Sequence, residues 1–334
     1  MATAENAKLQ YEAGQTSTAM SALTDGGDQT TFESSATLWS GRSGYAPVVR
    51  PNGVLTGFGV TVHTDNDKVS IAAGTLNLAG VVTSVSAGTL TTSRGVSSDT
   101  HMITSLTINS SGALAAVAGT DSTAFSETRG AAGGPPYIPV GSVEIGQVRT
   151  TSVTAAALVA AEVFTVVGTH RERADYPLFT TNYGPTIVDG VETVPGGSVT
   201  FLAALPEIHT GDLPKKVYAS FASPIFSDVA LASDFVPPET SHSVSSTQVY
   251  GTTLGSTSSS LGQGSFTAYL QDGVSDALVT LKNATLWFKF YPDRYATPYL
   301  LAQGKLGISR TFPAGDTLQA ACTISASAAS VEVI

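Results

Sequence analysis

Short apolar runs separated by turn residues follow one another along this chain, and their spacing limits the folds that it can adopt. In the first half, such runs occupy 69–71, 76–78, 81–85 and 101–108, with segments rich in Gly, Ser and Thr between them. Strands that repeat every 8–12 residues or so are typical of a β-sandwich or barrel. The pattern therefore predicts an all-β protein with at most one or two short helices.

The composition favours a structural subunit over an enzyme. Only 13% of the residues are charged, whereas an ordinary soluble domain has about 25%. The chain is still 42% hydrophobic, which separates it from a disordered Ser/Thr tract. A lone monomer with this composition would lack the charge that keeps proteins apart, so we expect neighbouring subunits to cover much of its surface.

Charge and cysteine content exclude several classes of protein. The net charge of −10 argues against a surface that grips DNA or RNA, which needs a basic patch. Cys322 is the only cysteine, so no intramolecular disulfide is expected, and we predict that it is a small buried residue in a terminal strand. The first residues lack the basic start and apolar run of a signal peptide. The smoothest apolar stretch, 153–167, is too short and too polar to span a bilayer. We therefore expect a soluble protein made in a cytoplasm, with no membrane partner.

The chain divides into an arm and two modules. Residues 1–45 read as an extended N-terminal arm, with a short helix possible at 5–13; such an arm either packs on another subunit or folds back on its own domain. Residues 46–168 form the first β-module, which includes an alternating strand at 54–62 and an Ala-rich stretch at 154–161 that suits one or two helical turns. The densely charged segment 168–175 marks the passage to a second β-module at 169–334.

The second module contains three distinctive segments. Residues 235–264 form a long polar stretch that is either a projecting hairpin in need of a partner or a mobile surface loop. The run 284–291 has aromatic residues on both faces, so both faces should be covered. Residues 300–325 form a hairpin with its turn at 312–316, and 329–334 form a last short strand.

A search for catalytic or metal-binding chemistry finds no supported site. The five histidines, His63, His101, His170, His209 and His242, do not lie at metal-ligand spacing from one another or from Cys322. The sequence around His170 (HRER) reads as a surface ion-pair cluster. No nucleophile elbow or phosphate-binding loop is present, so we expect neither an enzyme nor a cofactor.

Two aromatic–proline corners are candidate contacts. Each could bind a sugar or a peptide, but Tyr and Arg are enriched at protein interfaces, so we favour contacts between subunits. The candidate contact residues are Tyr176, Phe179, Trp287, Tyr291, Arg294 and Tyr295.

The order of features in the second module resembles the major tail tube protein of long non-contractile-tailed bacteriophages. The resemblance rests on an early Arg-rich segment, the central stretch 235–264, the late aromatic strand 286–291 and the final hairpin 304–325. The first module is similar to small β-modules of phage tail and fibre proteins, through the segments 69–80 and 138–148.

The resemblance implies a tail-tube-like β-sandwich or barrel that closes into a ring, with an extra β-module on the outside. Its subunits form hexameric rings that stack into a hollow tube in the virion tail. The implied partners are other copies of the chain, a tape-measure protein and tail-end proteins, and DNA passes through without specific binding. Like charge would keep DNA from sticking to the wall, so we expect acidic residues to face the lumen. The candidates are Asp189, Glu192, Asp272, Asp276 and Asp316.

Two other functions remain open at this stage. A fibre, decoration or receptor-binding β-protein would bind a host glycan on an exposed aromatic platform at Tyr137, Tyr250 or Tyr299. Fibre shafts usually show regular repeats, and this chain has none. A hydrolase built on a β-fold would need a His/Asp/Ser site or a pair of carboxylates, and the spacing of these residues in the sequence does not indicate either.

Overall fold

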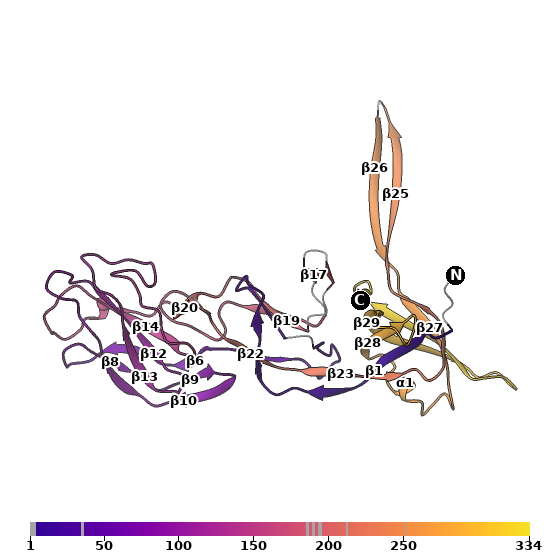
Figure 1. The fold of residues 1–334 in the computed structure, drawn as a ribbon, viewed down its shortest axis with the longest axis horizontal. Helices are drawn as coiled ribbons and strands as arrows, with labels where there is room; N and C mark the ends of the chain where they lie inside the picture. Colours follow the sequence, from indigo (N-terminus) through magenta and orange to yellow (C-terminus); the bar gives the residue numbers. More distant parts are fainter. Residues whose placement is uncertain are drawn as a thin grey trace.

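The chain folds into three β-units that lie in a row, with one long hairpin projecting to the side (Figure 1). The computed structural model describes residues 5–34, 37–184, 187–188, 191–192, 196–211, 213–250 and 252–334. Within these residues the helices are limited to α1 (Ala277–Thr280) and the 3-10 turn η1 (Ala160–Glu162). The predicted all-β class with one or two short helices is confirmed, but no sheet in the described residues closes into a barrel.

We call the unit at one end the sheet domain, which comprises residues 5–17 and 222–334. Its core contains Leu286, Phe288, Leu306 and Ile324, all fully buried. The antiparallel sheet has the order β23 (Ala222–Asp228), β1 (Lys8–Ser17), β28 (Thr285–Tyr291), β29 (Tyr299–Thr311), β30 (Gln319–Ala326), β27 (Gly264–Tyr269) and β24 (Ala232–Val236), and β31 (Val331–Val333) also pairs with β29.

The predicted N-terminal arm folds back on its own chain over residues 8–17. Strand β1 pairs with β23 on one side and with β28 on the other, so that Tyr11 lies opposite both Ser227 and Phe288. The predicted helix at 5–13 is wrong because Leu9 and Tyr11 alternate with more exposed residues at the period of a strand and fill the core beside the aromatic strand β28.

The aromatic strand is covered on both faces, as its sequence predicts. Leu286 and Phe288 face the sheet-domain core, whereas Trp287 points to the other side and packs with Leu38 and Leu301. The final hairpin is also confirmed, as β29 and β30, and Cys322 lies buried on β30.

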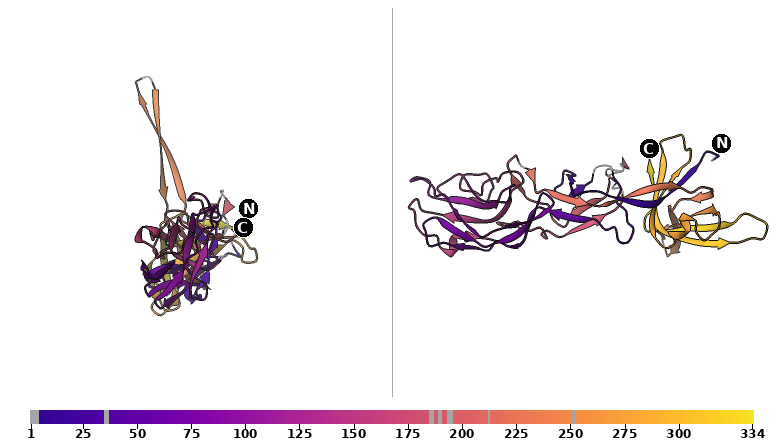
Figure 2. Two further views of the ribbon diagram at one scale, coloured as in Figure 1. Left: turned by 90° about the vertical axis from the view of Figure 1, so that its left-hand side faces the viewer. Right: turned by 90° about the horizontal axis from the view of Figure 1, so that it is seen from below.

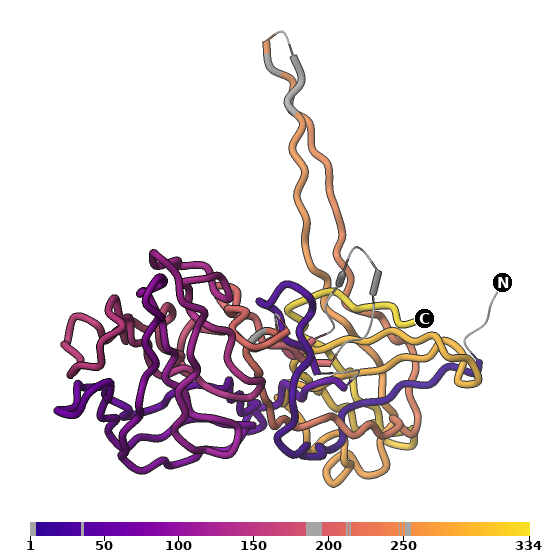
Figure 3. The backbone as a smooth tube through the Cα atoms, turned by 60° about the vertical axis from the view of Figure 1, so that its left-hand side comes forward, coloured from indigo at the N-terminus to yellow at the C-terminus, as the bar shows by residue number. Residues whose placement is uncertain are grey.

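The long polar stretch forms a hairpin, which is one of the two structures expected for it. Strands β25 (Thr240–Val249) and β26 (Thr252–Leu261) pair along their full length and leave the sheet domain at a steep angle to the row of units (Figures 1 and 3). Ten residues in each strand give the hairpin a length of about 33 Å.

The middle unit comprises residues 18–51 and 176–221. Its core is formed by Phe32, Trp39, Phe201, Val217 and Phe221. One sheet has the order β2 (Ser21–Ala22), β22 (Val217–Ser220), β5 (Val48–Pro51), and the other has the order β16 (Phe179–Asn182), β19 (Ser198–Phe201), β4 (Thr31–Glu33), β3 (Thr24–Asp25); β17 (Ile187–Val188) and β18 (Val191–Glu192) form a separate pair. The chain thus has a third unit where the sequence predicted an arm and one undivided module at 169–334.

The outer unit, residues 52–175, corresponds closely to the first predicted module. Its core contains Leu76, Leu106, Ile108 and Ile145. Its sheets are β6 (Gly53–Gly57), β9 (Gly74–Leu78) and β10 (Val81–Val85); β7 (Val60–Val62), β8 (Lys68–Ile71) and β11 (Gly88–Thr91); and β12 (Met102–Ile108), β13 (Leu114–Ala118), β14 (Val143–Thr150) and β15 (Val163–Phe164). The right-hand view of Figure 2 shows this unit at the opposite end of the row from the sheet domain.

Two local expectations for the outer unit are wrong. The predicted strand 54–62 is broken between β6 and β7, which belong to different sheets, because Gly57 and Phe58 both adopt positive φ and the Phe58 ring turns into the core. The Ala-rich stretch 154–161 contributes only the start of the three-residue turn η1.

The charged segment 168–175 is bonded to the outer unit as its last segment, and the chain enters the middle unit directly after it. The backbone N–H of Glu172 donates to the carbonyl of Glu144 at 2.9 Å, and that of Ala174 donates to Val54 at 3.0 Å. The strand pair β20 (Glu207–His209) and β21 (Leu213–Pro214) then reaches the outer unit from the other side, where the N–H of Ile138 donates to Ile208 at 2.9 Å.

Candidate functional site

The projecting hairpin has no charged residue along its strands that would discourage pairing with another strand. Residues 240–261 include no Lys, Arg, Asp or Glu. Within the described chain, β25 and β26 pair only with each other, so both outer edges present unpaired backbone groups. Natural proteins usually blunt such edges with charges, proline or bulges. The described structure thus leaves both edges of the hairpin open.

One face of the hairpin is a ladder of serine hydroxyls. Ser241 and Ser260 face each other with their Oγ atoms 3.0 Å apart, and the next two cross-strand Ser pairs repeat the contact at 2.7 Å. The other face presents Val244, which is 77% exposed, opposite Thr257. Both faces are smooth and uncharged, so another layer of protein can approach closely without desolvating a charge.

The predicted subunit contacts do not gather into one patch. Trp287 is 4% exposed and lies inside its own chain, which rules it out as a surface contact in this conformation. Tyr176 and Tyr295 are exposed, but Tyr176 lies at the start of the second segment of the middle unit and Tyr295 lies in the sheet domain. The others are Phe179, which packs on the middle core, Tyr291, which contacts Tyr299, and Arg294, which donates to the backbone carbonyls of Asn6 and Ala7.

Three of the predicted lumen acids lie at one end of the sheet domain. Asp272 and Asp276 belong to the turn before α1, and Asp316 belongs to the turn between β29 and β30. The two turns are joined because the Arg310 guanidinium donates to the carbonyl of Gly273. Asp189 and the side chain of Glu192 lie outside the described residues.

The acids of the first turn are also structural. The hydroxyl of Ser275, followed by the backbone N–H groups of Val274 and Ser275, lowers the pKa of Asp272 to about 2. Asp276 accepts hydrogen bonds from three backbone N–H groups, those of Gln271, Asp272 and Gly273. Both carboxylates hold the turn together through these hydrogen bonds.

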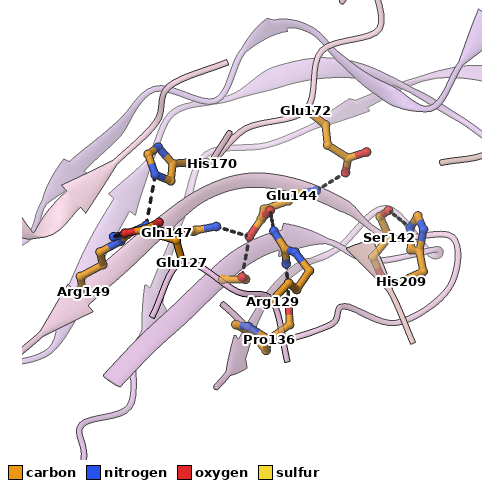
Figure 4. Close-up of polar contacts among 11 residues, drawn as sticks. Glu127, Arg129, Pro136, Ser142, Glu144, Gln147, Arg149, His170, Glu172 and His209 are labelled. Atoms are coloured by element: carbon orange, nitrogen blue, oxygen red, sulfur yellow. Dashed lines mark hydrogen bonds and ion pairs between the residues drawn. The ribbon is translucent and has the colours of Figure 1, made fainter. Parts of the chain in front are cut away.

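A second feature is a buried ionic network in the outer unit, shown in Figure 4. Glu144 on β14 forms an ion pair with Arg129 at 2.5 Å and accepts hydrogen bonds from Ser105 at 2.5 Å and Gln147 at 3.1 Å. Burial raises the pKa of Glu144, and the nearby Arg129 opposes that rise. Removing one partner of such a pair would leave the other charge buried and unpaired.

Glu172 continues the network toward the middle unit. Its Oε2 accepts a hydrogen bond from the backbone N–H of Glu144 at 2.6 Å, whereas its Oε1 finds no partner among the described residues. Burial raises the pKa of Glu172 to about 7, and the ammonium of Lys215 partly offsets this. Lys215 is 2% exposed and donates to the carbonyl of Arg173 at 2.8 Å.

The sequence HRER is thus not a surface ion-pair cluster. His170 and Glu172 are buried, and only Arg173, paired with Asp175 at 2.6 Å, fits the prediction. His170 lies 3.3 Å from the guanidinium of Arg149, and burial together with that guanidinium lowers the pKa of His170. Arg149 in turn forms a two-point ion pair with Glu127, at 2.5 and 2.9 Å.

These residues line a cleft of about 370 Å³ between the outer unit and the segment 203–208. Among the described residues, no group of three His, Cys, Asp or Glu could hold a metal ion. His209 contacts the carbonyl of Ser142 at 3.0 Å and takes no part in a triad with a nucleophile in the contacts of the described chain.

Sequence reasoning missed this cleft because its residues come from five separate parts of the chain, near 127–135, 144–149, 168–177, 203–208 and 215. Glu127, Glu144, Glu172 and Lys215 have no shared spacing or pattern. The available signal was the cluster of charges at 168–175 in a chain with few charges, but a charged segment more often lies on the surface.

The chain shows no match to known proteins: no family model, no curated protein and no solved structure matches it. Within the described residues, no helix has the length and apolar character needed to cross a membrane.

Proposed function

We propose that this protein is a structural virion protein that polymerises into stacked rings and forms the hollow tail tube through which phage DNA passes. The observation that carries the proposal is the projecting hairpin, with two unpaired edges and no charged residue. A free strand edge of this length is a liability in a monomer, and pairing with a second copy removes it. The occupant that we propose for the hairpin is therefore another subunit.

The open sheet of the sheet domain supports the same proposal. Its terminal strands β23 and β24 leave two more edges that a neighbouring subunit can extend, as happens when sheets from several subunits join into a ring. A contact between two different surfaces repeats around a ring, and we assign the projecting hairpin to the contact with the next ring. The elongated row of units places the outer unit far from these edges, which suits a position on the outside of the tube (Figure 2).

The charge distribution is also consistent with a conduit for DNA. The chain carries a net charge of −10, and Asp272, Asp276 and Asp316 belong to two turns of the sheet domain that the bond from Arg310 to Gly273 connects. Fixed negative charge at the lumen would repel phosphates and prevent adhesion. We assign Asp272, Asp276 and Asp316 to the lumen within this proposal.

The experiment compares two matched Val→Lys variants by sedimentation velocity. Val244→Lys places a charge on the hairpin, and Val81→Lys places the same charge on an exposed valine of strand β10 in the outer unit. A lysine on a pairing strand discourages further pairing. The wild type and Val81→Lys should polymerise alike, whereas Val244→Lys should raise the concentration needed for polymerisation by about tenfold or more.

Two results would contradict the proposal. If Val244→Lys polymerised as readily as the wild type, the hairpin would not form part of the contact between subunits. If the wild type stayed monomeric at the highest soluble concentration, the protein would not self-assemble and the proposal would be wrong.

A further inference from the structure

The cleft between the outer unit and residues 203–208 has the dimensions of a ligand site. Its volume of about 370 Å³ falls in the range of roughly 300–1,000 Å³ that small-molecule sites occupy. It also lies at a junction between units, which is a common place for such sites. Ala203, Ala204 and Pro206 form an apolar wall opposite the polar network.

Tyr176 provides an aromatic surface in this cleft. Its side chain is 52% exposed, and its ring rests against Gly168, whose φ is +81°. A Cβ atom at position 168 would collide with the ring, so the glycine leaves the space that the ring occupies. The backbone thus supports the ring from one side while much of the ring stays open to the cleft.

The polar wall offers both hydrogen-bond donors and acceptors, and two of its carboxylates are held in ion pairs. Glu127 is paired with Arg149, and Glu144 with Arg129. At these two pairs a charged ligand would compete with the existing partner, whereas a neutral polar ligand can bond to the remaining lone pairs and N–H groups. The chemistry of the wall therefore selects a ligand that is itself neutral and carries both donors and acceptors.

Four buried polar atoms of the same wall have no partner among the described residues. They are Oε1 of Glu172, Nδ1 of His170, Nε of Arg149 and Nε of Arg171, and the first two belong to side chains that are more than nine-tenths buried. Unsatisfied buried groups are costly, and in native proteins each calls for an explanation such as a bound ligand or water. Their concentration around one cleft marks it as a site that a polar molecule completes.

We propose that this cleft binds a neutral saccharide. One apolar face of a pyranose ring stacks on Tyr176, and neighbouring hydroxyls of the sugar donate to Glu127 and accept from Arg149. An aromatic platform beside a two-point carboxylate–guanidinium pair matches the two kinds of surface that a sugar presents. This proposal does not rest on tube formation, because every residue that it uses lies in the outer unit or at its border with the middle unit.

The test measures binding of neutral trisaccharides to the full chain by calorimetry and saturation-transfer NMR. The probes are the trisaccharides of glucose, galactose, mannose and N-acetylglucosamine, with trigalacturonate as an acidic probe. At least one neutral probe should bind saturably, and Tyr176→Ala should weaken that binding by about tenfold or more. Tyr176→Phe keeps the platform and should bind as the wild type does. Tyr295→Ala, an exposed tyrosine of the sheet domain, is the matched control and should also bind normally.

Each remaining outcome overturns the proposal. No saturable binding of any neutral probe up to about 10 mM would exclude even a millimolar site. Undiminished binding by Tyr176→Ala would place the sugar elsewhere. Binding of trigalacturonate alone, with a steep loss of affinity in salt, would show an anion site instead.

Discussion

The indole N–H of Trp287 donates a 3.0 Å hydrogen bond to the backbone carbonyl of Trp39, and this bond joins the sheet domain to the middle unit. Glu12 reinforces the same junction, because its carboxylate accepts from the hydroxyl of Ser40 at 2.5 Å and from the backbone N–H of Trp287 at 3.2 Å. The two units are therefore held by buried polar bonds as well as by the apolar contact of Leu38 with Leu301.

Replacing the indole should weaken this junction. Trp287→Phe keeps an aromatic ring but leaves the carbonyl of Trp39 without its donor and opens space beside Leu38. We expect a loss of about 2–4 kcal/mol in the free energy of unfolding. Urea denaturation followed by circular dichroism measures it, with Tyr295→Phe as an exposed aromatic control that should change stability by less than about 0.5 kcal/mol. A loss no greater than that of the control would show that the junction contributes little.

Glu172 should make stability depend on pH. Its pKa rises from an ordinary value near 4.5 to about 7 in the folded protein, mainly through burial. Between these values the folded carboxyl keeps a proton that the unfolded chain has lost, so the free energy of unfolding falls as the pH rises. The contribution is complete below pH 4.5 and is lost as the pH passes 7. One such group gives a slope of at most about 1.4 kcal/mol per pH unit.

Glu172→Gln tests this dependence while it keeps an acceptor for the N–H of Glu144. Thermal melts from pH 4 to pH 8 or so should show a shallower decline for the variant than for the wild type. Some slope should remain, because burial raises the pKa of Glu144 in the same direction. Thr169→Ala, an exposed and uncharged neighbour, should follow the wild-type curve. Identical slopes for Glu172→Gln and the wild type would mean that Glu172 is ionised alike in both states.

Gly168 should be required for the position of Tyr176. Alanine at this position meets the tyrosine ring and must also adopt a φ of +81°, which L residues rarely take. We expect Gly168→Ala to lower the free energy of unfolding by about 1–2 kcal/mol. It should also weaken saccharide binding, as Tyr176→Ala does. Gly44→Ala is the control for the backbone alone, because Gly44 also has positive φ but has open space around its missing Cβ. If both variants cost the same, the contact with Tyr176 adds nothing to the backbone strain.

Cys322 should be inert in the folded protein. Burial raises the pKa of its thiol to about 12, so almost no thiolate forms at neutral pH. A chromogenic disulfide reagent at pH 8 or so should label the thiol in denaturant but not in the native state. Rapid labelling of the native protein would show that β30 opens readily.

Local patterns predicted the strands that need no distant information. The run 284–291 combines β-branched and aromatic residues on both faces, and it forms β28 with Trp287 and Phe288 buried on opposite sides. The turn at 312–316 carries Pro and Gly between two alternating strands, and β29 and β30 meet there. For the stretch 235–264 the sequence left two possible structures, a projecting hairpin or a mobile loop, because a structureless loop of that length is uncommon inside a compact domain. The structure shows the hairpin, at 240–261.

The errors arise where partners are far apart in the sequence. Nothing local indicates that Tyr11 lies between residues 227 and 288, so the N-terminal strand read as an arm. The burial of His170 and Glu172 depends on Glu127, Arg149 and Lys215, which the sequence keeps well apart. The strand breaks at Phe58 because its ring packs in the core of the outer unit. Most residues of that core are distant in the sequence, so the alternating pattern at 54–62 cannot reveal the break.

Negative-stain electron microscopy of the concentrated wild-type protein tests the central claim most directly. The account predicts hollow tubes of uniform width, with ring-shaped end views of six-fold symmetry, and their absence from a Val244→Lys preparation. Discrete monomers or trimers in the wild-type preparation would contradict it.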